Sequence, residues 1–168
     1  YDETRAGIEK WHGKGRAHYA ITPRFAITST PEQMEMAEAL AREFPDCHIQ
    51  THVSENLAEI EFARDLYPNL VDYVGIYERY HLLGPKTLLG HCIHLSHREV
   101  EIISETRSVA VFCPTSNLFI GSGLFDYERL HSRGARIAVA TVVGGGASYS
   151  MLRTLDEGYN VRQLRGTR

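Results

Sequence analysis

The stretch CHIQTHVSENLAEIEFARDLY, residues 47–67, contains the repeating unit on which the fold depends. Its first seven residues, 47–53, are rich in apolar and β-branched side chains and are typical of a strand. Asn56 with Glu59 then opens an amphipathic helix that continues to residue 67. A strand followed directly by a helix is typical of a parallel sheet, because parallel neighbours need a crossover connection.

The same alternation of strand and helix recurs along the chain. We expect five strands, at 18–22, 47–53, 87–92, 108–113 and 136–141. We expect helices after Thr30, Asn56 and Ser96, over 124–134 and from about 148 to 159, and a short one within 71–80. The fold class is therefore α/β, either a doubly wound open sheet or part of a (β/α)₈ barrel. A complete barrel takes about 250 residues, so five units in 168 residues would be a little over half of one.

Composition excludes several classes of protein. The net charge of −3 gives no electrostatic reason to bind nucleic acid or an anionic membrane. No apolar run approaches the roughly 18 residues of a membrane span, and we expect a single domain over 1–168. Cys47, Cys92 and Cys113 form no CxxC pair, which predicts reduced thiols in a cytoplasmic protein. The first residue is Tyr1, so the chain is either processed or a piece of something longer.

Two histidines stand at the carboxyl ends of neighbouring predicted strands, where α/β proteins bind ligands. His52 ends the second strand, His91 ends the third, and Glu55 lies three residues beyond His52. A catalytic zinc site holds the ion with several protein groups and leaves one position for water, whose pKa falls to about 7. A carboxylate beside the metal can then carry protons. A single histidine at a strand end is more often structural, and Glu55 alone could complement a helix N-terminus.

Five segments together resemble one family. They are AITPRFA (20–26), QTHVSEN (50–56), LLGHCIHLS (88–96), VFCPTSN (111–117) and IAVATVVGGG (137–146). They look like the carboxyl-terminal part of the guanine deaminase family, zinc hydrolases of the amidohydrolase superfamily. The resemblance implies a partial (β/α)₈ TIM barrel of the metal-dependent hydrolase type, about strands 4 to 8 with their helices. It also implies a Zn²⁺ cofactor and hydrolysis of guanine to xanthine and ammonia.

The resemblance gives five residues a role. His52 matches a metal ligand, and His91 matches a histidine that binds metal or orients the attacking water. Glu55 matches the proton shuttle between that water and the purine ring. Arg24 resembles the arginine that donates to the purine carbonyl, and Phe25 the aromatic that stacks on the base. Taken alone, Arg24 could be an exposed loop charge and Phe25 a core residue.

Two departures from the family pattern affect the activity. Val142 occupies the position of an aspartate that ligates zinc, and an alkyl group cannot coordinate a metal ion. The His-x-His pair of the first barrel strand has no counterpart in place, because the resemblance begins at the fourth strand. We therefore expect this chain to be inactive alone. A partial barrel also exposes two sheet edges, which predicts a homo-oligomer or a missing amino-terminal half.

Three other interpretations remain open. The chain could derive from another amidohydrolase, such as a chlorohydrolase or a different aminohydrolase. It could be a non-catalytic pseudoenzyme or binding module, which Val142 favours. It could also be a flavodoxin-like domain, although no phosphate-binding glycine pattern follows the first strand. His94 and His97 are expected on the loop and first helical turn after the third strand, with little chance of binding metal.

Overall fold

The computed structural model of the chain describes residues 1–166 and contains a parallel sheet of five strands. The strands are β1 (Ala20–Ile21), β2 (His48–Val53), β3 (Thr87–His91), β4 (Val109–Phe112) and β5 (Arg136–Val139). They lie in the order β1-β2-β3-β4-β5, and every neighbouring pair is parallel. A doubly wound sheet reverses its strand order at a switch point, whereas this order follows the chain without a reversal. The α/β partial barrel is confirmed, and the doubly wound and flavodoxin-like alternatives are wrong.

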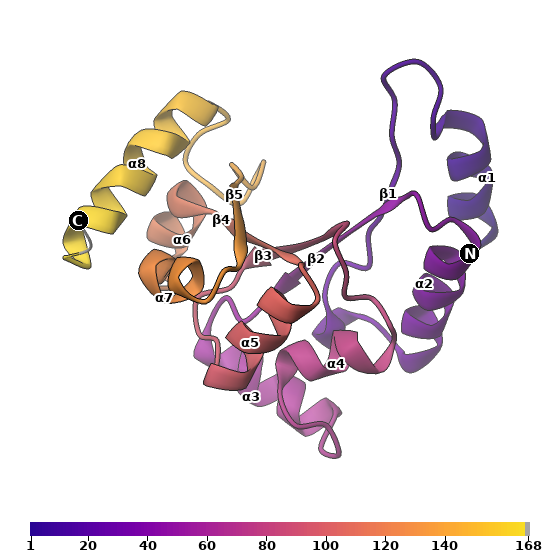
Figure 1. Cartoon of the computed structure of the whole chain (residues 1–168), viewed down its shortest axis with the longest axis horizontal. Helices are drawn as coiled ribbons and strands as arrows, with labels where there is room; N and C mark the ends of the chain where they lie inside the picture. Colours follow the sequence, from indigo (N-terminus) through magenta and orange to yellow (C-terminus); the bar gives the residue numbers. More distant parts are fainter. Residues whose placement is uncertain (167–168) are drawn as a thin grey trace.

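The helices follow the strands in the expected alternation (Figure 1). They are α1 (Asp2–Trp11), η1 (Ala26–Thr28), α2 (Pro31–Glu43), α3 (Leu57–Leu66), α4 (Tyr73–Arg79), α5 (His97–Glu105), α6 (Pro114–Ile120), α7 (Tyr127–Ser132) and α8 (Met151–Leu164). Side-chain caps begin α2, α3 and α5 at Thr30, Asn56 and Ser96, as predicted. Within residues 1–166, every helix is too short or too polar to cross a membrane.

Several elements differ from the expectation, and helix α1 was not expected at all. The first strand shortens to two residues, and the helix expected over 124–134 starts only at Tyr127, after the Asp126 cap. The last helix is capped by Ser150 and continues to Leu164. Helix α6 follows β4 almost at once, because Pro114 occupies its first turn, where proline is favoured.

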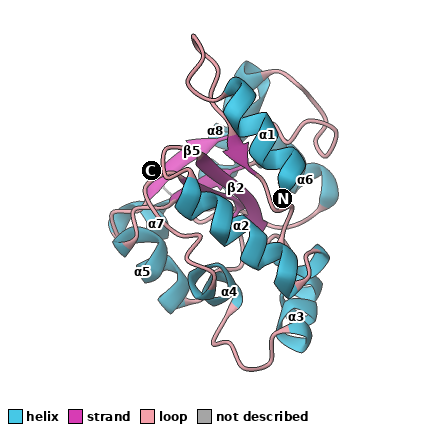
Figure 2. Ribbon diagram, turned by 90° about the vertical axis from the view of Figure 1, so that its right-hand side faces the viewer, coloured by secondary structure: helices cyan, strands magenta, loops and turns pink. Residues whose placement is uncertain are grey.

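The helices cover one face of the sheet and its two sides. In Figure 1, α3, α4 and α5 lie below the sheet, α1 and α2 lie on the right, and α6, α7 and α8 lie on the left. Figure 2 shows α1 and α2 in front of the sheet when the molecule is viewed from that side. The upper face of the sheet's centre carries no helix. This arrangement is that of a barrel wall opened out, with the inner face uncovered.

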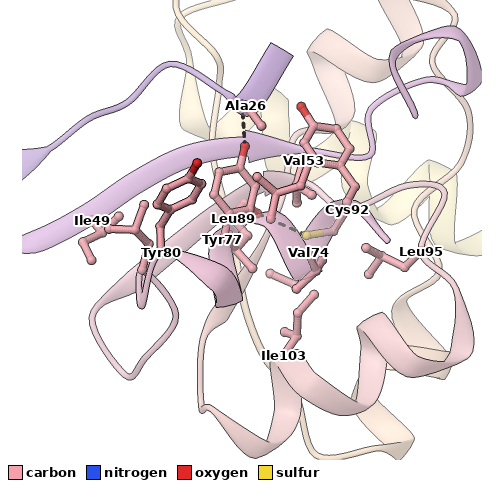
Figure 3. Packing of buried hydrophobic residues seen from close by; sticks show 14 of the residues in the cluster. Ala26, Ile49, Val53, Val74, Tyr77, Tyr80, Leu89, Cys92, Leu95 and Ile103 are labelled. Atoms are coloured by element: carbon pink, nitrogen blue, oxygen red, sulfur yellow. Dashed lines mark hydrogen bonds between the residues drawn. The ribbon is translucent and has the colours of Figure 1, made fainter. Parts of the chain in front are cut away.

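The two faces of the sheet pack differently. On β2, Ile49, Thr51 and Val53 are buried on the helix side, while His52 alternates to the open side. The main core fills the space between sheet and helices, and Figure 3 shows part of it around Tyr77. A small second cluster lies on the open face of β4, formed by Val109, Val111 and Cys113 with half-buried neighbours Leu88, Ala138, Ala140 and Val142.

Candidate functional site

All the residues singled out in the sequence line one cavity of about 180 Å³ at the carboxyl ends of the strands. They are Arg24, Phe25, His52, Glu55, His91 and Val142. They come from β2, β3 and the segments that follow β1, β2 and β5, so the parallel sheet brings together residues more than 100 positions apart. A larger cavity of about 650 Å³ between α3, α4 and α5 contains none of them.

His52 has one ring nitrogen free for a ligand. Its Nδ1 lies 2.6 Å from the carbonyl oxygen of Arg24 and must donate, because a carbonyl only accepts. The lone pair is then on Nε2. A metal-binding histidine usually donates its other ring N–H to a carbonyl or carboxylate in this way, so His52 fits a metal ligand.

His91 is almost completely buried, with 1% of its surface exposed. Its ring stacks on that of His52, with centroids 5.4 Å apart and planes at 23°. Burial, and to a smaller extent the nearby His52, lower the pKa of His91 to about 4, although the hydrogen bond with Asn117 acts in the opposite direction. The imidazole is therefore neutral at pH 7, which is the form that binds metal.

Asn117 is a site residue that the sequence did not single out. Its amide nitrogen lies 2.8 Å from Nδ1 of His91, and it reaches that position from α6. With the amide in this orientation His91 carries its hydrogen on Nε2, which suits a group that contacts water. The opposite amide orientation would let Nδ1 donate to Oδ1, a buried oxygen now without a partner, and would free Nε2 for a metal. Asn117 therefore controls which role His91 can take.

Glu55 points into the same cavity from the loop after β2. Its Oε1 lies 3.4 Å from Nδ1 of His91 and accepts a hydrogen bond from Ser122 Oγ at 3.1 Å. Burial raises the pKa of the Glu55 carboxyl, and the Ser122 hydroxyl lowers it. His94 Nε2 donates to the carbonyl of Ser122 at 2.8 Å. His94 thus supports the residue that holds Glu55, and its small chance of binding metal stays a prediction.

Arg24 and Phe25 form the outer wall of the cavity. The Arg24 guanidinium lies 5.0 Å from the centre of the Phe25 ring. Phe25 meets His52 edge-on, with centroids 5.9 Å apart and planes at 67°. Arg24 is exposed and Phe25 is half-buried, so the guanidinium and part of the ring remain accessible to a ligand. Both can contact a flat heterocycle entering the cavity.

Backbone strain gathers at the strand ends. Ser54, His91, Cys92 and Val142 have φ values of 51°, 74°, 52° and 52°, in the left-handed region. A β-branched residue with such a φ is an outlier, whereas aspartate and asparagine adopt this conformation more readily. Strained residues of this kind cluster at functional sites. The backbone at Val142 therefore has the conformation of a position that suits an aspartate.

The glycine turn after β5 closes the cavity on one side. The amides of Gly145 and Gly146 donate to the carbonyl of Val142 at 2.9 and 3.1 Å. A Cβ on Gly146 would lie 2.8 Å from the carbonyl oxygen of Thr141 and 3.2 Å from the backbone nitrogen of Ser116, so the turn needs glycine there. The turn places Val142 beside the two histidines without adding a polar group of its own.

The side chains of this cavity do not by themselves make a complete metal site. Among residues 1–166, no group of three or more histidine, cysteine, aspartate or glutamate side chains is arranged to hold a metal ion. His52 and His91 supply two imidazoles, and Val142 adds none. The open face beside them forms a groove of about 500 Å³ that is otherwise mostly apolar.

Comparisons with known proteins find relatives along the whole of this chain. The model of the amidohydrolase family matches residues 1–166. The chain is 45% identical over 168 residues to guanine deaminase of Escherichia coli K12, and 40% identical over 166 residues to the probable guanine deaminase of Deinococcus radiodurans. These matches cover 100% and 99% of this chain but 38% of each relative, so the chain spans about two fifths of their length.

Solved structures of guanine deaminases superpose on almost the whole of this chain. The E. coli guanine deaminase structure superposes with a TM-score of 0.98 over 100% of this chain and 39% of that one, at 45% identity. Guanine deaminase from C. acetobutylicum, solved with guanine in its active site, has a TM-score of 0.91 at 28% identity, over 99% of this chain and 41% of that one. The predicted family is confirmed, and this chain belongs to the amidohydrolase family.

Proposed function

We propose that this chain forms the carboxyl-terminal part of a zinc-dependent guanine deaminase, with residues 1–168 as a single partial barrel domain. The reaction is hydrolysis of guanine to xanthine and ammonia, a step of purine breakdown or salvage in the cytoplasm. One observation carries the proposal. The two imidazoles, the carboxylate, the guanidinium and the aromatic ring that this chemistry needs line one cavity, in a chain 45% identical to a guanine deaminase.

Each side chain has a role that its contacts support. Arg24 donates to the carbonyl oxygen of guanine, and Phe25 packs against the ring. Glu55, already close to Ser122 and His91, accepts a proton from the attacking water and delivers it to the leaving amine. Burial of Glu55 raises its pKa, which makes it a stronger base toward water at neutral pH.

His52 and His91 would hold the zinc ion, and when bound the ion supplies a water of lowered pKa. His52 fits this role through its free Nε2. Two imidazoles without an acidic partner make a weak site. We therefore propose that the chain alone is inactive and that the remaining ligands come from a preceding segment or a second copy.

The test uses the natural polypeptide that contains this sequence, loaded with zinc. Ammonia and xanthine are measured with guanine as substrate, in the wild type and in Glu55→Gln. Deamination by the wild type and at least a hundredfold loss in the variant are expected from removal of a general base. If the polypeptide turns over adenine or an s-triazine but not guanine, the assignment of guanine as the substrate is wrong and the chain belongs to an amidohydrolase that acts on another substrate.

Val142 favours a second candidate, a non-catalytic module that binds a purine without hydrolysing it. Isothermal titration with guanine distinguishes the two, because this candidate predicts binding without ammonia release. Binding should be weakened in Arg24→Ala in either case. Ammonia release from the wild-type polypeptide would exclude the non-catalytic module.

A further inference from the structure

Helix α4 carries two buried tyrosines one helical turn apart, and they differ in their hydrogen bonds. The rings of Tyr73 and Tyr77 stack with centroids 5.9 Å apart, and their side chains are 3% and 0% exposed. The hydroxyl of Tyr77 donates to the carbonyl of His52 at 2.6 Å and accepts from the backbone N–H of Ala26 at 3.1 Å. Figure 3 shows the bond to Ala26. Thr51 Oγ1 is the third partner, also at 3.1 Å.

These three hydrogen bonds connect the loop after Phe25 to strand β2 on the face of the sheet opposite the cavity. Ala26 directly follows Arg24 and Phe25, and His52 is on β2. Thr51 Oγ1 also lies 3.3 Å from the carbonyl of Arg24, and the backbone N–H of His52 donates to the same carbonyl at 3.2 Å. The Tyr77 hydroxyl thus sits between the loop that carries the base-binding residues and the strand that carries the imidazole.

We propose that Tyr77 is a positioning residue that fixes the loop of Arg24 and Phe25 relative to His52, from the side of the sheet opposite the cavity. The assignment of those three residues to guanine and metal rests on the proposed function. Tyr77 does not contact the cavity. Its hydroxyl satisfies a buried N–H and a partly buried carbonyl, and both groups would lose a partner without it. The loop would then relax by moving away from β2, which displaces the ring of Phe25 and the guanidinium of Arg24.

Tyr73 supplies a matched control on the same helix. Its hydroxyl faces Glu59 and Tyr77 without a hydrogen bond of good geometry to either, and among the described residues it has no bond to the Arg24–Ala26 segment or to β2. Tyr73→Phe and Tyr77→Phe remove the same atom from the same kind of buried ring. Only the second breaks bonds to the loop, so a difference between the variants measures the positioning effect and not the loss of a phenol.

The first measurement is amide hydrogen exchange at Ala26 in the natural polypeptide that contains this sequence. Tyr77→Phe should speed exchange at Ala26 more than at core amides of β3, and Tyr73→Phe should leave it unchanged. Equal rates in the two variants would overturn the proposal. This readout needs neither zinc nor guanine, so it stands even where the proposed function fails. If Tyr77→Phe does not fold, Thr51→Val removes the neighbouring hydroxyl and should speed the same amide.

The second measurement separates positioning from stability. With zinc and guanine, Tyr77→Phe should raise KM about tenfold or more, with a smaller change in kcat, because a displaced loop weakens base binding; a misplacement of about 1 Å can cost a hundredfold. Tyr73→Phe should keep the wild-type KM. An unchanged KM in Tyr77→Phe beside faster exchange at Ala26 would overturn the positioning role. If the wild type neither binds nor deaminates guanine, the proposed function is refuted. In that case hydrogen exchange at Ala26 alone decides whether Tyr77 fixes the loop of Arg24 and Phe25.

Discussion

The substitution Val142→Asp tests whether the end of β5 is a metal position that has lost its acid. The backbone there has a φ of 52°, which a β-branched residue adopts only with strain. The left-handed conformation costs an L-residue roughly 1–2 kcal/mol, and asparagine or aspartate offsets part of this through local hydrogen bonds. The side chain is half-buried against Val109, Val111 and Cys113, so replacing it loses about 1 kcal/mol of packing.

These two terms nearly cancel, and the control is Val142→Asn. Asparagine has the same shape and the same tolerance of a positive φ but no charge. We expect Val142→Asn to unfold in urea with a free energy within about 1 kcal/mol of the wild type. A loss of several kcal/mol, of the size seen for polar substitutions in a core, would mean that the backbone is not strained by valine.

Zinc binding then distinguishes the effect of the carboxylate charge at position 142 from the effect of the backbone conformation there. A carboxylate beside His52 and His91 completes a set of three ligands, and even an outer-shell partner changes metal affinity about 10–100-fold. We expect Val142→Asp to bind zinc at least tenfold more tightly than Val142→Asn, measured by competition with a chelator, and to gain thermal stability with zinc in proportion. Equal affinities in the two variants would refute the idea that this position faces the metal.

Three further predictions follow from the site and the open sheet. Ser122→Ala removes the hydrogen bond that lowers the pKa of Glu55, so the acid limb of the kcat/KM profile should move to higher pH; an unmoved limb would exclude Glu55 as the base. The pKa of His91 is about 4 in the folded chain, below the usual value of about 6.5 for histidine, so the unfolded chain takes up the proton first. Stability should therefore fall by roughly 3 kcal/mol as the pH drops from 6.5 to 4, and urea titrations should show a much smaller fall in His91→Gln. The chain alone should self-associate at micromolar concentration through its open face and the edges β1 and β5, and a monodisperse monomer in sedimentation would contradict this.

The strands and most helix starts could be predicted from the sequence because local signals determine them. Asn56 and Ser96 each form a capping box with a glutamate three residues on, and both caps are present. Helix α6 was missed because its proline directly follows a strand. The seven residues 114–120 are too few to show an apolar period, so the segment resembles a strand end followed by a loop.

The candidate site was predictable where a side chain belongs to a strand end or, like Arg24 and Phe25, to a segment that resembles the family. His52 and His91 could be placed in this way, because parallel strands bring their carboxyl ends to one edge. Ser122, Asn117 and Tyr77 could not, since each reaches the site from a helix or loop through tertiary packing. Their hydrogen bonds span 67, 26 and 51 residues of sequence, to Glu55, His91 and Ala26 respectively. No local pattern carries information over such separations.

The strained backbone adds an argument that side-chain identities alone do not give. Left-handed residues end β3 and follow β2 and β5, at His91, Ser54 and Val142. A φ of this sign turns the chain sharply, and the residues around these turns face one cavity. At His91 the cost accompanies a group that binds metal or water in our proposal, and Ser54 directly precedes Glu55, the proton carrier of that proposal. At Val142 the same cost remains with no polar group to justify it, so the conformation there is better explained by a requirement for an acidic residue than by any contact that valine makes.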